Sequence, residues 1–363
     1  MRKLFIYLLR RPILWISNQF TSQPDKDRIY QSLTNLFSSI LTEPEKNGLQ
    51  IHFDAWKDKF IIFSDQHKGR RNGADDFAAS EENYLTALEY YNKQGFIFVN
   101  LGDCEELWEN STVSVIKNNK KAFELEKKFL RRDAFVKIFG NHDLYWNYGP
   151  LAPLELEIIY GKKIKVHEGV VLSTQINEKA LNIFCTHGHQ GDARSDGNKF
   201  TKFFVANIWA PLQAYLRINP NEPSNSIYKK TIHNQIMYEW SATKENTLLI
   251  TGHTHQAVFE SLTYIERLFR DMQRAKKNND NVLFTDLDNQ TKSLKRNFAV
   301  VKTDFLSMQS GYFNTGCCCF SDGDITGIEL ESGYIRLIKW ESKNDAPCHR
   351  VVLEEKELQS LMT

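Results

Sequence analysis

Six of the ten histidines in this chain lie just beyond the end of a short apolar stretch, together with two aspartates and one asparagine. These residues are Asp65, His67, Asp103, Asn141, His142, His187, His189, His253 and His255. Neutral imidazoles combined with carboxylates and a carboxamide form a mixed nitrogen and oxygen ligand set, which suits Mn²⁺, Fe or Zn²⁺ better than Ca²⁺ or Mg²⁺. A set of this size is too large for one tetrahedral ion and fits two ions that share a bridging ligand. Taken singly, each aspartate could instead cap a helix, and each histidine could be structural.

The stretches before these residues have the composition of buried strands. Phe135–Phe139, for example, contains four apolar residues in five and is followed by Gly140. The other four stretches are 59–63, 96–99, 181–184 and 248–250. Helical patterns near 78–93 and 117–131 lie between them, and this alternation is typical of a layered α/β fold. Since open α/β sheets bind ligands at the carboxyl edge of their strands, we expect the polar residues to converge there.

Composition limits the classes of protein that fit. The chain has 363 residues, of which 25% are charged, as expected for a folded protein with one large domain or two smaller ones. Its 46 basic and 45 acidic residues give a formal net charge of +1, so no basic excess indicates a nucleic-acid partner. Three of the six cysteines are adjacent, Cys317 to Cys319, and no Cys-x-x-Cys spacing occurs. We therefore expect a reducing, cytoplasmic compartment.

The ordered set of motifs resembles the calcineurin-like metallophosphoesterases. The motifs are Asp-x-His at 65–67, Gly-Asp at 102–103, Gly-Asn-His-Asp at 140–143, Thr-His-Gly-His at 186–189 and Gly-His-Thr-His at 252–255. The resemblance extends from about Lys59 to Trp340, apart from two insertions. It implies an α/β fold in which two mixed sheets form a sandwich flanked by helices, with two metal ions at the edges of the sheets.

The resemblance also implies which residues bind the two ions. The first ion would be held by Asp65, His67 and His255, the second by Asn141, His187 and His253, and Asp103 would bridge both. We expect Mn²⁺, with Fe or Zn²⁺ as alternatives. Two such ions would activate a water molecule as hydroxide and neutralise the phosphate oxygens during an in-line attack.

His142 resembles the general acid of the family, because it follows a ligand of the second ion without being expected to bind metal. Such an imidazole works better when a carboxylate orients it. Glu106 lies three residues past Asp103, where the family commonly has an acid in this role. The alternative for Glu106 is a carboxylate in the first turn of a helix, which the helix dipole favours.

Three further residues are candidates for contact with the substrate. Arg70 or Arg71 could bind a phosphate, since a guanidinium matches two phosphate oxygens at once. The alternative is a solvated cluster of charges. His189 follows the expected ligand His187 and could position the substrate or the metal.

The pattern Gly-Asp-x-x-Glu-x-Trp at 102–108 and an insertion at about 190–245 are similar to the UDP-2,3-diacylglucosamine pyrophosphatases. That group usually has Arg in place of His142 and Asp in place of His189, so the lipid-linked substrate is only an alternative. The insertion predicts two helices, one at 198–218 and one with Ile232, Ile236, Met237 and Trp240 on one side. They would form either a hairpin that closes the sandwich or a cap over the metal ions.

The ends of the chain and a second insertion complete the predicted organisation. We expect an N-terminal helical segment at 1–48, a metallophosphoesterase domain at 49–345, and a C-terminal tail at 346–363 that is a short helix or frayed. Residues 1–17 are basic and aromatic, and either pack on the domain or lie on a membrane surface. The second insertion, at 256–297, predicts a helix with solvated arginines at 267, 270 and 274, and the alternative is that this basic face meets an acidic partner.

Three functions fit these observations. The first is a binuclear metal hydrolase of phosphate monoesters or diesters. The second is a nuclease of the same superfamily, against which the neutral net charge counts. The third is a scaffold whose metal site has decayed, against which the complete set of candidate ligands counts.

Overall fold

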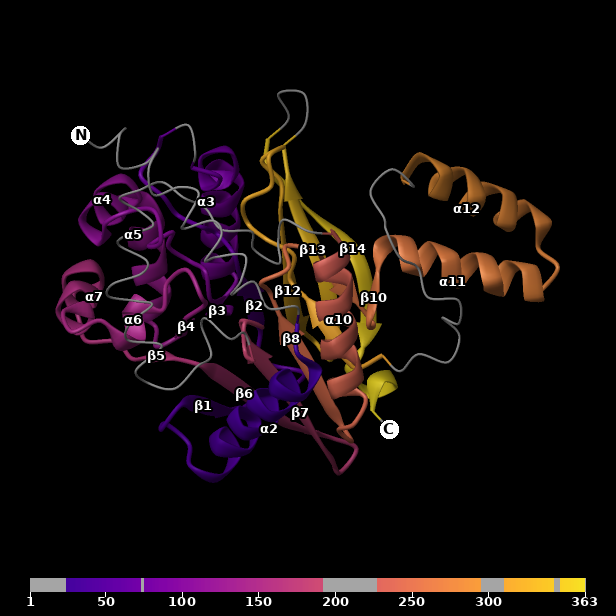
Figure 1. Ribbon diagram of the computed structural model, residues 1–363, viewed down its shortest axis with the longest axis horizontal. Coiled ribbons are helices and arrows are strands. Elements are labelled where there is room, and N and C mark those ends of the chain that lie inside the picture. The colour runs from indigo at the N-terminus through magenta and orange to yellow at the C-terminus, as the bar shows by residue number, and fades with distance from the viewer. Residues whose placement is uncertain (1–23, 73–74, 192–226, 295–309, 343–346, 363) are drawn as a thin grey trace.

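The apolar stretches that precede the candidate ligands are strands of two mixed sheets that face each other, each with seven strands (Figure 1). The computed structural model describes residues 24–72, 75–191, 227–294, 310–342 and 347–362. The predicted α/β sandwich of two mixed sheets flanked by helices is confirmed.

One sheet has the strand order β14-β13-β12-β2-β3-β4-β5. Its parallel half contains the first three predicted strands, β2 (Phe60–Phe63), β3 (Ile97–Leu101) and β4 (Phe135–Ile138), followed by β5 (Val166–His167). Its antiparallel half consists of β12 (Ile325–Glu331), β13 (Tyr334–Glu341) and β14 (His349–Glu357). The candidate residues that follow β2, β3 and β4 therefore lie on neighbouring parallel strands, at the same edge of the sheet.

The other sheet has the order β1-β6-β7-β8-β11-β9-β10. Its strands are β1 (Gly48–His52), β6 (Gly169–Ile176), β7 (Lys179–Thr186), β8 (Thr247–Thr251), β9 (Val258–Phe259), β10 (Leu262–Thr263) and β11 (Tyr312–Asn314). Strands β7 and β8 pair in parallel, so that the two histidine motifs that follow them also leave the sheet at one edge.

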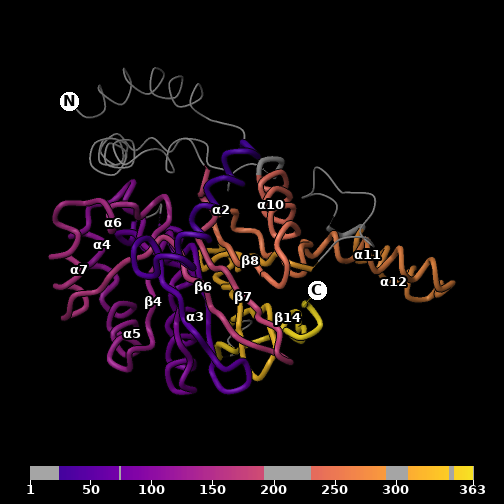
Figure 2. The backbone as a smooth tube through the Cα atoms, turned by 90° about the horizontal axis from the view of Figure 1, so that it is seen from below, coloured from indigo at the N-terminus to yellow at the C-terminus, as the bar shows by residue number. Residues whose placement is uncertain are grey.

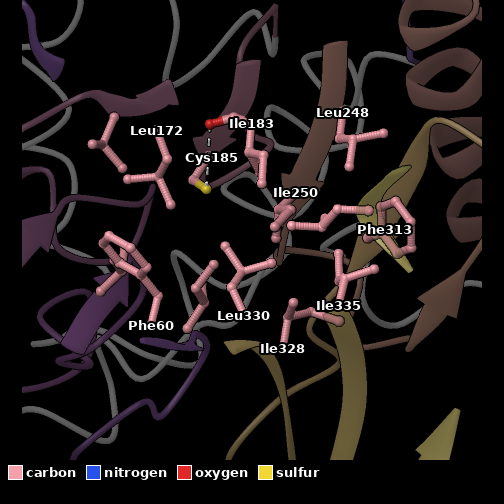
Figure 3. Packing of buried hydrophobic residues seen from close by; sticks show 14 of the residues in the cluster. Phe60, Leu172, Ile183, Cys185, Leu248, Ile250, Phe313, Ile328, Leu330 and Ile335 are labelled. Atoms are coloured by element: carbon pink, nitrogen blue, oxygen red, sulfur yellow. Dashed lines mark hydrogen bonds between the residues drawn. The ribbon is translucent and has the colours of Figure 1, made fainter. Parts of the chain in front are cut away.

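The main hydrophobic core lies between the two sheets. Figure 3 shows Phe60, Ile328 and Leu330 of one sheet pointing toward side chains of the other sheet. Ile183 and Ile250, from β7 and β8, have no exposed surface. Burying each such side chain contributes about 1.5–3 kcal/mol, so the strands that carry the candidate ligands are held firmly in place.

Helices cover the outer face of each sheet. On the sheet that contains β2, the covering helices are α3 (Phe77–Lys93) and α5 (Lys120–Leu130), and on the other sheet they are α2 (Lys26–Thr42) and α10 (Ile227–Ser241). Figure 2 shows α2 and α10 side by side. The helix expected near 117–131 is divided at Asn119, because a short helix, α4 (Thr112–Asn118), ends there and α5 begins. Two further helices, α6 (Tyr145–Tyr148) and α7 (Ala152–Tyr160), precede β5.

The C-terminal tail differs from the prediction. A short helix is present only as the 3₁₀ turn η4 (Leu358–Leu361), whereas His349–Glu357 forms the edge strand β14. Most residues of β14 are partly or fully exposed, so its sequence lacks the apolar character of the central strands. It is held by pairing with β13 instead, and this pairing has no local sequence signal.

The second insertion forms a helical hairpin, α11 (Tyr264–Lys277) and α12 (Asn281–Leu294), which extends away from the sandwich in Figure 1. The expectation of solvated arginines is wrong for Arg267, which is only 4% exposed. Its guanidinium donates to Glu354 of β14 at 3.0 Å and to the carbonyl of Leu262 at 2.6 Å. The unpredicted strand therefore supplies the partner that allows this arginine to be buried.

The predictions for residues 1–17 and for the helix at 198–218 lie outside the described residues. The second helix predicted in the first insertion is present as α10, and Ile236, Met237 and Trp240 are buried against α2 and the sheet. The boundaries at 49 and 345 stay predictions. None of the helices in the described ranges has both the length and the apolar composition needed to cross a membrane.

Candidate metal centre

The loops after β2 and β3 continue the pairing of these strands and so place the first candidate ligands. The N–H of Asp65 donates to the carbonyl of Gly102 at 3.0 Å, and the N–H of His67 donates to that of Asp103 at 2.9 Å. Five candidate ligands have left-handed backbone conformations, with φ between 49° and 69°: Asp65, His67, Asp103, His253 and His255. This conformation costs about 1–2 kcal/mol for a residue with a side chain. Such strain is typical of functional sites.

The residues expected to hold the first ion lie together. The Nε2 atom of His255 is 3.2 Å from Oδ1 of Asp65 and 3.1 Å from Nε2 of His67. Asp65 is completely buried and His67 is 7% exposed. The three side chains therefore direct their ligand atoms at one another from loops that are nearly two hundred residues apart in the sequence.

The residues expected to hold the second ion are adjacent to the first group. The Nε2 atom of His187 is 3.3 Å from Oδ2 of Asp103 and 3.3 Å from Oδ1 of Asp65. Asp103 Oδ2 is also 3.8 Å from Nε2 of His67. The ligand atoms of Asp103, His187 and His253 all lie within 4.8 Å of one another. Each carboxylate thus touches histidines of both groups, as expected if two ions lie side by side.

Two glycines allow these side chains to approach the backbone. A Cβ atom at Gly140 would collide with the side chain and backbone nitrogen of Asp103. A Cβ atom at Gly252 would collide with the side chains of Ser64 and Asp65. Glycine is therefore required at both positions for the carboxylates to keep their places.

The charges of the site favour a cation. Burial alone would lower the pKa of His187, but the carboxylates of Asp103 and Asp65 outweigh it and raise this pKa to about 10. Burial would likewise lower the pKa of His67, but Glu106 and Asp103 raise it to about 9. Burial would raise the pKa of Asp103, yet His187 and His142 hold it well below its usual range. The carboxylates thus draw positive charge into a buried site, and divalent cations would supply it while leaving the imidazoles neutral for coordination.

The donor set fits a pair of metal ions. Within the described residues, the side-chain oxygen of Asn141 is buried without a hydrogen-bond partner. A buried carbonyl oxygen of this kind is costly unless it binds a donor or a cation. The facing imidazole nitrogens of His67 and His255 offer lone pairs to a common ion when both rings are neutral.

His142 lies beside the candidate ligands and is held by two neighbours. Its Nδ1 atom is 2.7 Å from Oε2 of Glu106, and the same oxygen is 3.0 Å from Nδ1 of His67. The indole of Trp108 stacks on the imidazole of His142, with ring centroids 4.2 Å apart and an angle of 19° between the planes. The alternative of a helical first-turn carboxylate is wrong for Glu106, because it lies in a loop before α4.

The family model of the calcineurin-like phosphoesterases matches residues 58–257, which are 200 of the 363 residues. This chain belongs to the calcineurin-like phosphoesterases. It is therefore a metal-dependent phosphoric ester hydrolase, and its candidate ligands are grouped as a dimetal centre requires.

Solved structures similar to this phosphoesterase include a dimetal phosphatase from Danio rerio, with 8% identity over 82% of this chain and 99% of that chain and a TM-score of 0.33. A cold-active protein tyrosine phosphatase has 11% identity over 86% of this chain and 82% of its own, with a TM-score of 0.34. A putative 5'-nucleotidase from Staphylococcus aureus has 13% identity over 83% and 54%, with a TM-score of 0.32. No curated protein matches the chain.

The candidates for substrate contact occupy different surroundings in this phosphoesterase. The guanidinium of Arg71 binds Glu81 at 2.6 Å and the side chain of Asn119 at 2.9 Å, while Arg70 is half-buried. His189 is completely buried, and its Nδ1 atom lies 3.1 Å from Nδ1 of His187. His189 therefore lies behind a candidate ligand, on the side away from the two aspartates.

Sequence reasoning missed several residues that border the site of this phosphoesterase. His233 and Asn234, on α10, bind the loops that carry the histidine motifs. Cys319 places its sulfur 3.8 Å from Nδ1 of His255. A single His-Asn pair in a helix carries no local signal of such a role, because its partners are distant in the sequence.

Proposed function

We propose that this phosphoesterase hydrolyses phosphate monoesters or diesters with a pair of divalent cations, and that His142 is the general acid. The observation that supports this most is that Asp65 and Asp103 each meet histidines of both expected ligand groups, Asp65 within 3.3 Å and Asp103 within 3.8 Å. When bound, the cations supply an activated water near neutral pH and neutralise the charge of the phosphate oxygens. Mn²⁺ is the cation that we propose, with Fe or Zn²⁺ as alternatives.

The side chains around the ions would hold the protons in place. The carboxylate of Glu106 accepts a hydrogen bond from the Nδ1–H of His142 and so stabilises the charged imidazolium. The imidazolium then has a second proton, on Nε2, for the leaving oxygen. The pKa of Glu106 supports this role: burial would raise it, but His142 and His67 lower it to about 2. Glu106 thus stays ionised near neutral pH, and Trp108 fixes the plane of the imidazole.

A pair of substrates tests the role of His142. The variant His142→Ala should bind both ions as the wild type does and lose about 10²–10⁴-fold in turnover of an alkyl phosphate, which needs a proton on its leaving group. Turnover of p-nitrophenyl phosphate should fall far less, since p-nitrophenolate leaves without a proton. Equal losses on both substrates, or no loss on either, would remove His142 from the mechanism.

A substrate panel with Mn²⁺ added tests the activity itself. It would compare p-nitrophenyl phosphate, its bis ester, nucleotides and UDP-diacylglucosamine, which covers the lipid-linked alternative. A metal-loaded protein that is inert on the whole panel would favour the scaffold interpretation. Salt-sensitive binding to DNA would favour a nuclease. Arg70 and Arg71 remain proposed substrate contacts, and alanine variants that raise KM on the preferred substrate would support them. His189, which lies behind His187, remains proposed as a residue that positions the metal.

A cytoplasmic location, with contact of residues 1–17 with a membrane surface as the alternative, is part of the same proposal. All six cysteines are free thiols, which agrees with a reducing compartment. Fractionation of cells that produce the full chain would separate the two locations.

A further inference from the structure

We infer that helix α10 positions metal-binding residues of both groups, because His233 binds the loop after β7 and Asn234 binds the loop after β8. This inference rests on the proposed dimetal function and adds positioning residues to it. The two residues are adjacent in the sequence and are 5% and 7% exposed. Neither belongs to the ligand motifs, and both come from the helix that precedes β8.

His233 holds the loop after β7. Its Nε2 atom is 2.8 Å from the carbonyl oxygen of Gly188, the residue between His187 and His189. A carbonyl oxygen can only accept a hydrogen bond, so Nε2 must carry the proton. Gly188 has a φ of 105°, and its N–H donates to the side chain of Gln190 at 3.0 Å. Gly188, the residue next to the candidate ligand His187, is therefore held through both its N–H and its carbonyl.

Asn234 holds the loop after β8. Its Oδ1 atom accepts hydrogen bonds from the hydroxyl of Thr254 at 3.3 Å and from that of Tyr312 at 2.9 Å. Its Nδ2 atom donates to the side chain of Gln256 at 3.0 Å. Thr254 and Gln256 lie directly before and after His255, and Thr254 also follows His253. One side chain thus binds the residues that flank a candidate ligand of each ion.

The apolar side of α10 makes these contacts rigid. Trp240 and Met237 have no exposed surface and pack with α2 and the strands beneath them. The indole N–H of Trp240 also donates to the hydroxyl of Thr34 in α2 at 3.0 Å. Because the helix cannot shift without breaking this packing, its polar residues act as fixed supports for the two loops.

The two supports should affect the two ions differently. His233 binds the loop of His187, and its ring packs on that of His253 with centroids 5.3 Å apart; both of these ligands belong to the second ion. Asn234 acts on a loop that carries His253 for the second ion and His255 for the first. Loss of an outer hydrogen-bond partner commonly lowers metal affinity about 10–100-fold. We expect His233→Ala to weaken one of two Mn²⁺ affinities by this factor, and Asn234→Ala to weaken both.

Calorimetric titration of metal-free protein with Mn²⁺ measures both affinities, and electron paramagnetic resonance of Mn²⁺ separates a coupled ion pair from a single ion. His233→Ala should give the spectrum of a single ion at Mn²⁺ concentrations that fill both sites of the wild type. His233→Gln, whose amide can donate to the same carbonyl, should restore the coupled spectrum. Gln235→Ala, an exposed neighbour on α10, is the matched control and should behave as the wild type.

Thermal unfolding of the metal-free variants distinguishes positioning from a purely structural role. Lower melting temperatures with unchanged Mn²⁺ affinities would overturn the inference. Failure of His233→Gln to restore the Mn²⁺ affinity lost in His233→Ala would also overturn it. If an alanine variant does not fold, Thr254→Val removes the hydrogen bond to Asn234 from the side of the loop, together with the one that Thr254 accepts from Asn314 at 3.3 Å. It should still weaken the affinity for both ions. Should the wild type bind two Mn²⁺ ions and hydrolyse no phosphate ester, the proposed function would fail while the affinity comparison would still decide the role of α10.

Discussion

Glu106 serves two histidines with one oxygen, and replacing its charge should therefore have two effects. Its Oε2 atom lies 2.7 Å from His142 and 3.0 Å from His67. The variant Glu106→Gln keeps the shape of the side chain and removes the charge. A hydrogen bond to a charged group contributes about 1.5–3 kcal/mol and a neutral one about 0.5–1.5 kcal/mol, so each bond should lose about 1–1.5 kcal/mol.

The two losses together are about 2–3 kcal/mol, or about 30- to 150-fold in kcat/KM for an alkyl phosphate. They can be separated by the concentration of Mn²⁺. The part of the loss in kcat/KM that acts through His67 comes from weaker metal binding, and it should disappear when Mn²⁺ is saturating. The part that acts through His142 should remain in kcat and should be small for p-nitrophenyl phosphate, which needs no general acid.

Glu124→Gln provides the control, since this glutamate is 58% exposed and pairs only with Lys127 among the contacts described. It should leave both Mn²⁺ affinity and kcat/KM within about twofold of the wild type, as expected for a surface ion pair. The reasoning would be refuted if Glu106→Gln lost less than about threefold in kcat/KM on the alkyl phosphate and bound Mn²⁺ normally.

Three further predictions concern other parts of the protein. Gly140→Ala should push Asp103 aside and lower Mn²⁺ affinity more than about tenfold in a calorimetric titration. Glu105→Gln should leave buried Lys137 without the carboxylate that it contacts at 2.9 Å and cost about 3–5 kcal/mol in urea unfolding, part of which the double variant with Lys137→Met should recover. Burial, and then the charge of Lys165, lower the pKa of His167 to about 4. Since the unfolded chain takes up this proton near pH 6.5, stability should fall by about 2 kcal/mol as the pH drops to 5, and His167→Phe should remove that dependence in unfolding curves at both pH values.

The central strands and the order of the candidate ligands were predictable because each depends on short stretches of sequence. A strand that is buried on both faces needs a continuous apolar run, and β2 and β8 have one. Strand β2 pairs in parallel with β3, and β8 with β7, so the residues that follow them leave each sheet at one edge. The assignment of Asp65 and His253 to one metal centre came from the family resemblance, because the two residues follow strands of different sheets.

Other features depend on partners that are remote in the sequence. Strand β14 is mostly exposed and forms only by pairing with β13, and Arg267 is buried only because β14 supplies Glu354. In the same way, His233 and Asn234 become part of the site through loops that begin at other strands. Local periodicity describes the helix that carries them and contains no information about which peptide each side chain will reach.

The left-handed backbone at Asp65, His67, Asp103, His253 and His255 also limits how this enzyme can be redesigned. Valine, isoleucine and threonine fit poorly in that conformation, whereas glycine, asparagine, aspartate and histidine adopt it most readily. Attempts to change the metal preference by exchanging ligands can therefore use only a few residue types at these five positions. Asparagine and aspartate exchanges will preserve the loops, while bulkier or branched donors will have to distort the chain before they can coordinate anything.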